Sequence, residues 1–470
     1  MTQDRFIRAL GLRDVILMNI VAIVGLRWIA RGARTGPASI ALWTLACLAF
    51  FVPLAYAVSE LSSRQPEQGG LYAWTRRAFG PVHGFICGWC LWVNNLFYFP
   101  SLLLFGAANA LAPFGEAGAA LAGSKGYASV FVLGGIWLTI GIGIIGLNAG
   151  KWIQNIGSAG TWGPAGLLIA AGAVALVTQG SATPFTATSL VPPLGEGFLD
   201  TVSLWSAMCF AFSGFEITAL MGQEVKRPER TIPLGVFIAG GVVAAIYVLG
   251  SIAVLVALPA DSLHELSGIT DAIDRVGTRV GLPALGGATG AMIAASAFAG
   301  TLSWMASAAR VPFAAGVDRV MPEALGRLHP RYRTPHVALV VQGIVATAIF
   351  VASVFFAIAG ARPTIQDGYD VMVNLTILIY FVPYLYLFLA LPRLRQTAGR
   401  RVPGEIRIPG GALGLWAISL TGFLATAISL GLVFVPPPGT ASVINYEASL
   451  LLQAAAVVGI GFLLYRRRSA

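Results

Sequence analysis

The segment NIVAIVGLRWIARGARTGP, residues 19–37, is apolar enough to enter a membrane but carries Gly25 at its centre. A second apolar segment, MCFAFSGFEITALMGQEV at 208–225, has Ser213 and Gly214 at its centre. Interrupted helices inside a bilayer are tolerated where the freed backbone lines a cavity, and pairs of them in two halves of a chain point to a binding site. The two segments therefore predict two broken helices around one polar site, although glycines that only pack helices together are an alternative explanation.

The composition is that of an integral membrane protein. Of 470 residues, 57% are hydrophobic and 11% charged, against roughly 45–50% and about 25% in soluble domains. A helix needs about 20 mostly apolar residues to cross a bilayer. Apolar runs between charged breaks predict an all-α fold of about twelve transmembrane helices, near 14–34, 38–61, 84–111, 127–147, 152–178, 200–222, 232–258, 286–312, 336–359, 371–392, 412–435 and 446–465.

The positions of the two interrupted spans suggest an internal repeat. They are the first and the sixth of the twelve, which is the spacing of two inverted repeats of five helices followed by two accessory helices. On this interpretation residues 1–178 form the first repeat, 179–395 the second, and 396–470 the accessory pair.

The basic residues predict how the chain is oriented. With the N-terminus inside, 23 of the 30 Lys and Arg residues fall at the cytoplasmic ends of spans, as the positive-inside rule requires. Both termini are therefore expected in the cytoplasm of a multi-pass protein of the cell membrane. In the outward loop at 260–281, Leu263, Leu266, Ile269 and Ile273 have helical spacing, so we expect an amphipathic helix, either over the outer mouth or solvated in the loop.

Several classes of function are disfavoured. The net charge of +10 is scattered through short loops and forms no basic patch, so no nucleic-acid partner is expected. The chain has no metalloprotease, nucleophile-elbow or phosphate-loop motif, so it is not expected to be an enzyme or to hydrolyse ATP. All four cysteines lie in apolar spans without a second C-x-x-C, and neither metal nor cofactor is expected. If the protein transports a solute, the remaining source of energy is coupling to an ion gradient or to exchange.

Four motifs carry a family resemblance. FAFSGFE at 210–216, with QEVKRPERTIPLG at 223–235, resembles the sixth span and following loop of the amino acid-polyamine-organocation (APC) superfamily of permeases. QGGLYAWTRRAFG at 68–80 and AARVPFAAGVDRVMPEALGRLHPRYRTPHVAL at 308–339 extend the similarity over nearly the whole chain. The resemblance implies an amino acid transporter with a five-plus-five inverted repeat, acting as a proton symporter or an exchanger.

The resemblance also implies roles for the residues of the sixth span. Phe210, Ser213, Gly214 and Phe215 would meet the amino group and cover the substrate, with Phe210 at the position of the family's aromatic gate. Trp304 falls where arginine exchangers of the family have a substrate-facing tryptophan. This apolar and aromatic lining favours neutral amino acids, with anionic ones second.

The first span departs from the family pattern. Its break at Gly25, Leu26 and Arg27 would meet the substrate carboxylate, but relatives usually read G-x-G-I there, so Arg27 replaces a glycine. Many relatives also carry a lysine in span five, where this chain has Thr161 or Trp162. An arginine inside a membrane is costly and is a functional candidate.

Three hypotheses account for Arg27. It supplies the missing fixed cation by pairing with backbone carbonyls or with Glu216, or it places its guanidinium in the pocket and favours acidic substrates. Alternatively, it reaches the outer vestibule beside Arg31 and Arg34 as a structural residue.

Glu216 is the second candidate for coupling besides Arg27. A carboxyl group inside a broken helix either exchanges a proton during transport or only structures the break through backbone hydrogen bonds. We thus expect a secondary active transporter of amino acids or amines, working by alternating access with a proton or a counter-substrate. The alternative is a non-transporting membrane amino acid sensor, or a subunit of a heteromeric complex.

Overall fold

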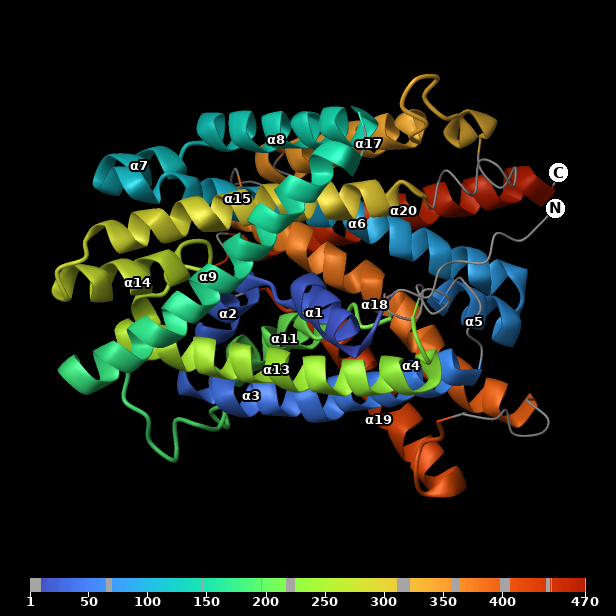
Figure 1. Ribbon diagram of the computed structural model, residues 1–470, viewed down its shortest axis with the longest axis horizontal. Helices are drawn as coiled ribbons and strands as arrows, with labels where there is room; N and C mark the ends of the chain where they lie inside the picture. The colour runs from blue at the N-terminus through green and yellow to red at the C-terminus, as the bar shows by residue number, and fades with distance from the viewer. Residues whose placement is uncertain are drawn as a thin grey trace.

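A computed structural model describes residues 10–64, 70–145, 147–195, 197–216, 225–310, 322–356, 363–397, 406–436, 440 and 442–469. In these ranges the regular elements are helices, apart from one isolated bridge between Leu10 and Val225. Most of the long helices run along one common direction (Figure 1). The expected all-α fold is confirmed.

Ten helices of the described residues are long and apolar enough to span a membrane. They are α3 (Ser39–Ala46) continued through the π-helical turn η2 (Cys47–Phe51) into α4 (Val52–Arg64), then α6 (Pro81–Ala110), α8 (Lys125–Ile145), α9 (Leu147–Gln179), α13 (Pro228–Ala257), α15 (Ala284–Ala308), α17 (His336–Phe355), α18 (Ile365–Thr397), α19 (Gly411–Leu432) and α20 (Val443–Ser469).

The two spans predicted to be broken are interrupted where the sequence indicated. The first consists of α1 (Leu12–Ile23) and α2 (Leu26–Ala33), which are bent by 54° and count together as an eleventh span. The sixth begins with α10 (Phe198–Ser203) and α11 (Trp205–Ala211), after which the helix stops. The rest of the predicted span 200–222 extends beyond the described residues, which stop at Glu216 and resume at Val225.

Three short α-helices of the described residues lie outside the spans. The sequence analysis missed α5 (Gly70–Phe79) and α7 (Gly115–Ala122), because helices of eight to ten residues have too few apolar positions to stand out. The amphipathic helix predicted within 260–281 is found as α14 (Gly268–Arg279). Its apolar side is not solvated: Ile269, Ile273 and Val276 are buried.

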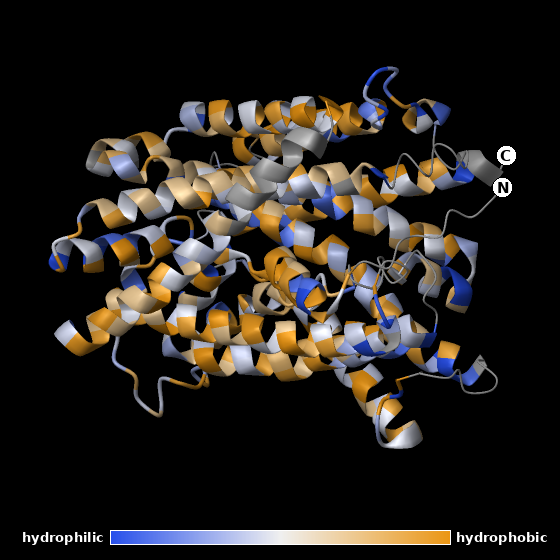
Figure 2. Cartoon of the chain, in the orientation of Figure 1, coloured by the Kyte–Doolittle hydropathy of each residue, from blue (hydrophilic) through white to orange (hydrophobic). Residues whose placement is uncertain are grey.

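Polar residues gather at the two ends of the helix bundle, whereas hydrophobic residues follow the helices along their length (Figure 2). α5 lies at the end of the bundle where the chain ends, and α7 and α14 lie at the opposite end (Figure 1). A band of apolar side chains between two polar ends is what a bilayer requires, so this is a multi-pass membrane protein.

The two interrupted spans are also joined through their backbones. The N–H of Lys226 donates to the carbonyl oxygen of Leu10 at 2.8 Å, which forms a parallel bridge between Leu10 and Val225. This backbone pair connects the segment before α1 to the segment that follows the sixth span.

Candidate functional site

The first break is built around Gly25. α1 ends at Ile23, and Val24 and Gly25 are extended before α2 begins. A Cβ atom on Gly25 would lie 2.6 Å from Cδ1 of the buried Trp28. Since carbon atoms do not approach so closely, only glycine lets the chain pass under this indole ring.

The second break follows α11 and depends on Gly214. This residue has φ of +105°, a conformation that is accessible to glycine and strained for residues with a Cβ atom. Ser213 turns its hydroxyl back to donate to the carbonyl of Phe210 at 2.6 Å. Phe215 is fully buried and its ring centroid lies 4.9 Å from that of Phe51.

One tyrosine on α13 serves both breaks. The hydroxyl of Tyr247 accepts from the N–H of Gly25 at 3.2 Å. It also lies 2.9 Å from the carbonyl oxygen of Ile23 and 3.1 Å from that of Ala211, toward which it can donate. Backbone groups freed by both interruptions thus find one partner, as polar groups inside a membrane must.

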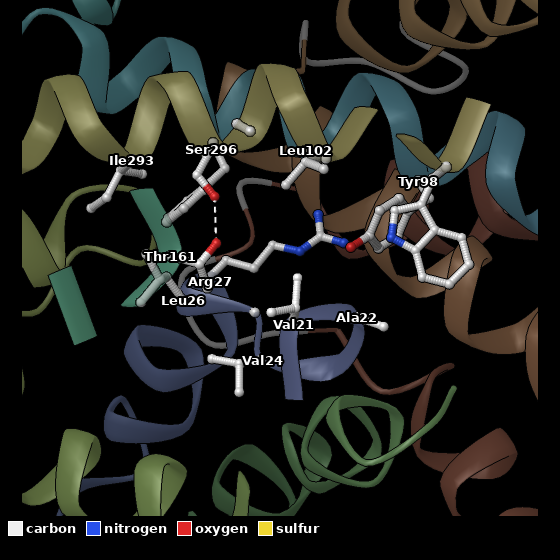
Figure 3. Close-up of a pocket in the computed structure, with 15 residues that line it drawn as sticks. Val21, Ala22, Val24, Leu26, Arg27, Tyr98, Leu102, Thr161, Ile293 and Ser296 are labelled. Carbon is white, nitrogen blue, oxygen red and sulfur yellow. Dashed lines mark hydrogen bonds between the residues drawn. The ribbon is translucent and has the colours of Figure 1, made fainter. Parts of the chain in front are cut away.

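A cavity of about 80 Å³ lies beside the first break, between α1 and α2 on one side and α6, α9 and α15 on the others (Figure 3). Its wall is formed by Val21, Ala22, Val24, Gly25, Leu26, Arg27, Tyr98, Leu102, Phe105, Thr161, Ile293, Ser296, Ala297, Gly300 and Trp304.

The structure brings together some of the predicted site residues and separates others. Gly25, Leu26, Arg27 and Trp304 line the cavity. The predicted residues of the sixth span do not line the cavity. They are Phe210, Ser213, Gly214, Phe215 and Glu216.

An aromatic layer lies between the two groups. The ring centroids of Trp28 and Phe210 are 5.3 Å apart, and those of Phe210 and Tyr380 are 5.5 Å apart. Arg27 lies directly against Trp28, with its guanidinium carbon 4.4 Å from the centroid of the ring. Phe210 therefore reaches the first break through Trp28, and both rings would have to shift for a substrate to touch both breaks.

Arg27 extends across the cavity toward Tyr98 (Figure 3). Its guanidinium carbon lies 4.4 Å from the Tyr98 ring centroid, as it does from that of Trp28, so both rings stabilise the group by cation–π attraction. Nη1 donates to Oγ of Ser101 at 3.0 Å, and Nη2 has no hydrogen-bond partner.

This placement bears on all three hypotheses for Arg27. Arg27 is 2% exposed, so the hypothesis that it reaches the outer vestibule is wrong. Of the partners considered for a fixed cation, Glu216 is wrong, because that carboxylate accepts from the hydroxyls of Tyr380 at 2.6 Å and Tyr384 at 2.7 Å. A role of Arg27 as the fixed cation stays a prediction. The guanidinium lies in the cavity, where the hypothesis of an acidic substrate places it.

Glu216 is held by α18 at the second break. Tyr384 accepts from the N–H of Gly214 at 3.0 Å while donating to the carboxylate of Glu216. The carboxylate is buried, with 4% of the residue exposed. Two hydroxyl donors stabilise a carboxylate in this apolar setting, and they can reorient to accept from a protonated one.

Arg31 on α2 and Arg34, directly after this helix, form a separate ion-pair network. The Arg31 guanidinium lies 2.6 Å from Glu265 and 2.9 Å from Asp370, and it donates to Asn374 at 3.2 Å. Arg34 lies 3.0 Å from the other oxygen of Glu265. These contacts join α2 to the segment before α14 and to α18.

Sequence reasoning missed most of the partners that give the site its shape. Tyr98, Tyr247, Tyr380 and Tyr384 all lie in apolar spans, and a hydroxyl buried there must find a partner; that was the available signal. Ser296 carried no such signal: its hydroxyl lies 2.6 Å from that of Thr161 at one end of the cavity (Figure 3).

The comparison with protein families decides what kind of protein this is. A family model described as "Amino acid permease" matches residues 10–462. The chain belongs to this family. The resemblance to the APC superfamily that the four motifs indicated is thereby confirmed. The relatives described next are named as transporters, not as enzymes.

Characterised and uncharacterised relatives match most of this permease. An uncharacterized transporter of Legionella pneumophila is 27% identical, over 92% of this chain and 90% of its own length. The probable agmatine/putrescine antiporter AguD of Lactococcus lactis is 25% identical, over 97% of this chain and 95% of its own length. The serine/threonine exchanger SteT of Bacillus subtilis is 27% identical, over 73% of this chain and 72% of its own length.

A solved structure shares the fold. The crystal structure of MhsT in complex with L-phenylalanine superposes with a TM-score of 0.58 at 15% sequence identity, covering 89% of this permease and 98% of MhsT. At this identity the similarity concerns the arrangement of helices alone.

Proposed function

We propose that this amino acid permease is a secondary active transporter of the cell membrane, with both termini cytoplasmic, that carries an amino acid by alternating access. The observation that carries the proposal is the cavity at the first break, at the junction of α1, α2, α6, α9 and α15. The non-helical backbone at Gly25 and polar side chains converge there inside an apolar bundle, which is how transporters of this architecture hold a polar solute without water.

In this proposal Gly25, Leu26, Arg27 and Trp304 contact the substrate first, because they line the cavity. Phe210 covers it after the Trp28 ring moves, since the two rings are in contact. Ser213, Gly214 and Phe215 then approach with the second break and meet the amino group. The repeat boundaries at 1–178, 179–395 and 396–470 describe the parts that would move against each other.

The driving force is either a proton taken up with the substrate or a counter-substrate. Arg27 and Glu216 are the coupling candidates: both are buried charged groups, one at each break. Ionisable groups at membrane depth mark ion and proton pathways, which supports coupling to protons. Relatives named as an antiporter and an exchanger support coupling to a counter-substrate.

Uptake by reconstituted vesicles tests the proposal. Purified protein is placed in proteoliposomes, and uptake of a panel of labelled amino acids and amines is measured with and without an inward proton gradient and with and without unlabelled substrate inside. Gradient-stimulated uptake supports proton symport, and uptake that requires internal substrate supports exchange. Binding without any uptake contradicts the proposal and favours a sensor or a subunit of a larger complex.

A further inference from the structure

The charge of the cavity wall is not balanced by the protein. Arg27 is the one charged side chain among the residues that line the cavity. It is 2% exposed, and its Nη2 atom lacks a hydrogen-bond partner. In the part of the chain that the structure describes, no carboxylate forms an ion pair with it.

The neighbouring buried acids are already engaged elsewhere. Glu216 accepts from two tyrosine hydroxyls on the far side of the aromatic layer. Glu265 and Asp370 are paired with Arg31. A buried guanidinium without a counter-ion is unfavourable, so the missing negative charge has to come from a ligand.

The geometry of the guanidinium specifies what that ligand presents. The guanidinium carbon lies 4.4 Å from the ring centroids of both Trp28 and Tyr98, and a planar guanidinium donates its hydrogen bonds from its edge. Ser101 occupies Nη1 on this edge and Nη2 remains open. A planar carboxylate bonds the edge of a guanidinium, whereas an ammonium group is repelled by it.

We propose that Arg27 binds the side-chain carboxylate of an acidic amino acid, so that the substrate class of this permease is aspartate, glutamate or a close analogue. This inference rests on the proposed transport function and concerns the same cavity. An acidic amino acid carries one net negative charge at neutral pH and leaves the occupied cavity neutral. A neutral amino acid, which is a zwitterion, leaves the occupied cavity with one net positive charge, and a diamine adds to that charge.

The opposite end of the cavity suits the rest of such a substrate. The hydroxyls of Thr161 and Ser296 lie there, away from the guanidinium (Figure 3). They can accept from the ammonium group and donate to the α-carboxylate. An acidic amino acid thus places its side-chain carboxylate at Arg27 and its ammonium and α-carboxylate groups at the hydroxyl end of the cavity. The agmatine or putrescine in the name of the relative AguD would instead bring a cation to Arg27.

Matched pairs of ligands test the charge directly. Dissociation constants for L-aspartate and L-asparagine, and for L-glutamate and L-glutamine, are measured on the purified full chain by calorimetry. Uptake of the same four compounds is measured in proteoliposomes. The wild-type protein is expected to bind each acid about 10- to 100-fold more tightly than its amide, since a hydrogen-bonded charge pair contributes about that factor.

Two substitutions of the same residue assign the effect. Arg27→Gln is expected to abolish the preference for acids while retaining affinity for the amides, and Arg27→Lys is expected to retain part of the preference, because it keeps the charge and loses the fork. An unchanged acid-to-amide ratio in Arg27→Gln overturns the inference. If that variant does not fold, the wild-type ratio and the Arg27→Lys ratio decide.

The outcomes separate this inference from the proposed function. Uptake of neutral amino acids with no preference for acids overturns the acidic substrate class and leaves transport intact. Preferential binding of acids without uptake of any compound supports the role of Arg27 and contradicts transport.

Discussion

At the residue scale, the hydroxyl of Tyr247 holds both breaks together. It contacts the N–H of Gly25 and the carbonyl oxygens of Ile23 and Ala211, which belong to two different interrupted spans. A single side chain therefore replaces the helical hydrogen bonds that both interruptions remove.

Substituting Tyr247→Phe removes these contacts while keeping the ring that stacks on Trp43. We expect the free energy of unfolding to fall by about 1–3 kcal/mol, since buried backbone groups lose their partner, and transport to slow. Thermal unfolding in detergent and proteoliposome uptake measure the two effects. Tyr127→Phe is the control, because it removes one hydroxyl bond, to Ala107, away from both breaks; equal effects of the two variants would contradict the special role of Tyr247.

Gly214 is the second residue on which a break depends, because its φ of +105° strains any side chain. Gly214→Ala is expected to destabilise the protein by about 1–2 kcal/mol and to reduce uptake. Gly134 on α8 is the matched control, since a Cβ atom there meets no atom within 4 Å. If Gly134→Ala and Gly214→Ala unfold at the same temperature, the strain at the second break is absent.

At the element scale, the network around Arg31 closes the end of the bundle where α14 lies. It ties α2 to the segment before α14 through Glu265 and to α18 through Asp370. By the predicted topology this end faces outward. Opening it requires these ion pairs to separate or the three elements to move together.

Asp370→Asn is expected to lower the free energy of unfolding by about 3–5 kcal/mol, because removing one partner leaves buried charge uncompensated. Asp274→Asn, on the exposed side of α14, should leave stability unchanged. Thermal unfolding of both variants in detergent provides the measurement. If the Asp370→Asn variant is as stable as the Asp274→Asn variant, then Asn374 and Glu265 suffice to hold Arg31.

At the scale of the whole molecule, the proposed transport cycle links the charges at the two breaks to a gradient. Glu216→Gln keeps the size of the side chain and a carbonyl for the two tyrosines but cannot release a proton. If protons drive transport through Glu216, uptake stimulated by a proton gradient is lost and exchange of labelled for unlabelled substrate persists. The control is Glu447→Gln, which removes an exposed carboxylate from α20. Undiminished gradient stimulation in Glu216→Gln would exclude this carboxylate as the coupling group.

Much of the architecture was predictable from the sequence, because a bilayer imposes long apolar runs and tolerates few interruptions. Gly25 and Gly214 therefore marked both breaks correctly. The direction of the Arg27 side chain was not predictable, since it depends on Tyr98 and Ser101 from a distant span. The cavity wall at Thr161 and Ser296 likewise forms only when α9 and α15 pack together.

The backbone pair between Leu10 and Val225 has a mechanical consequence at the end of the bundle opposite α14. Its hydrogen bond, from Lys226 to Leu10, contributes about 0.5–1.5 kcal/mol, which is close to thermal energy. A hydrogen bond of this strength keeps the two segments side by side but breaks within thermal fluctuations. In the proposed transport cycle, opening of this end would therefore be limited by the motion of the helices rather than by this bond.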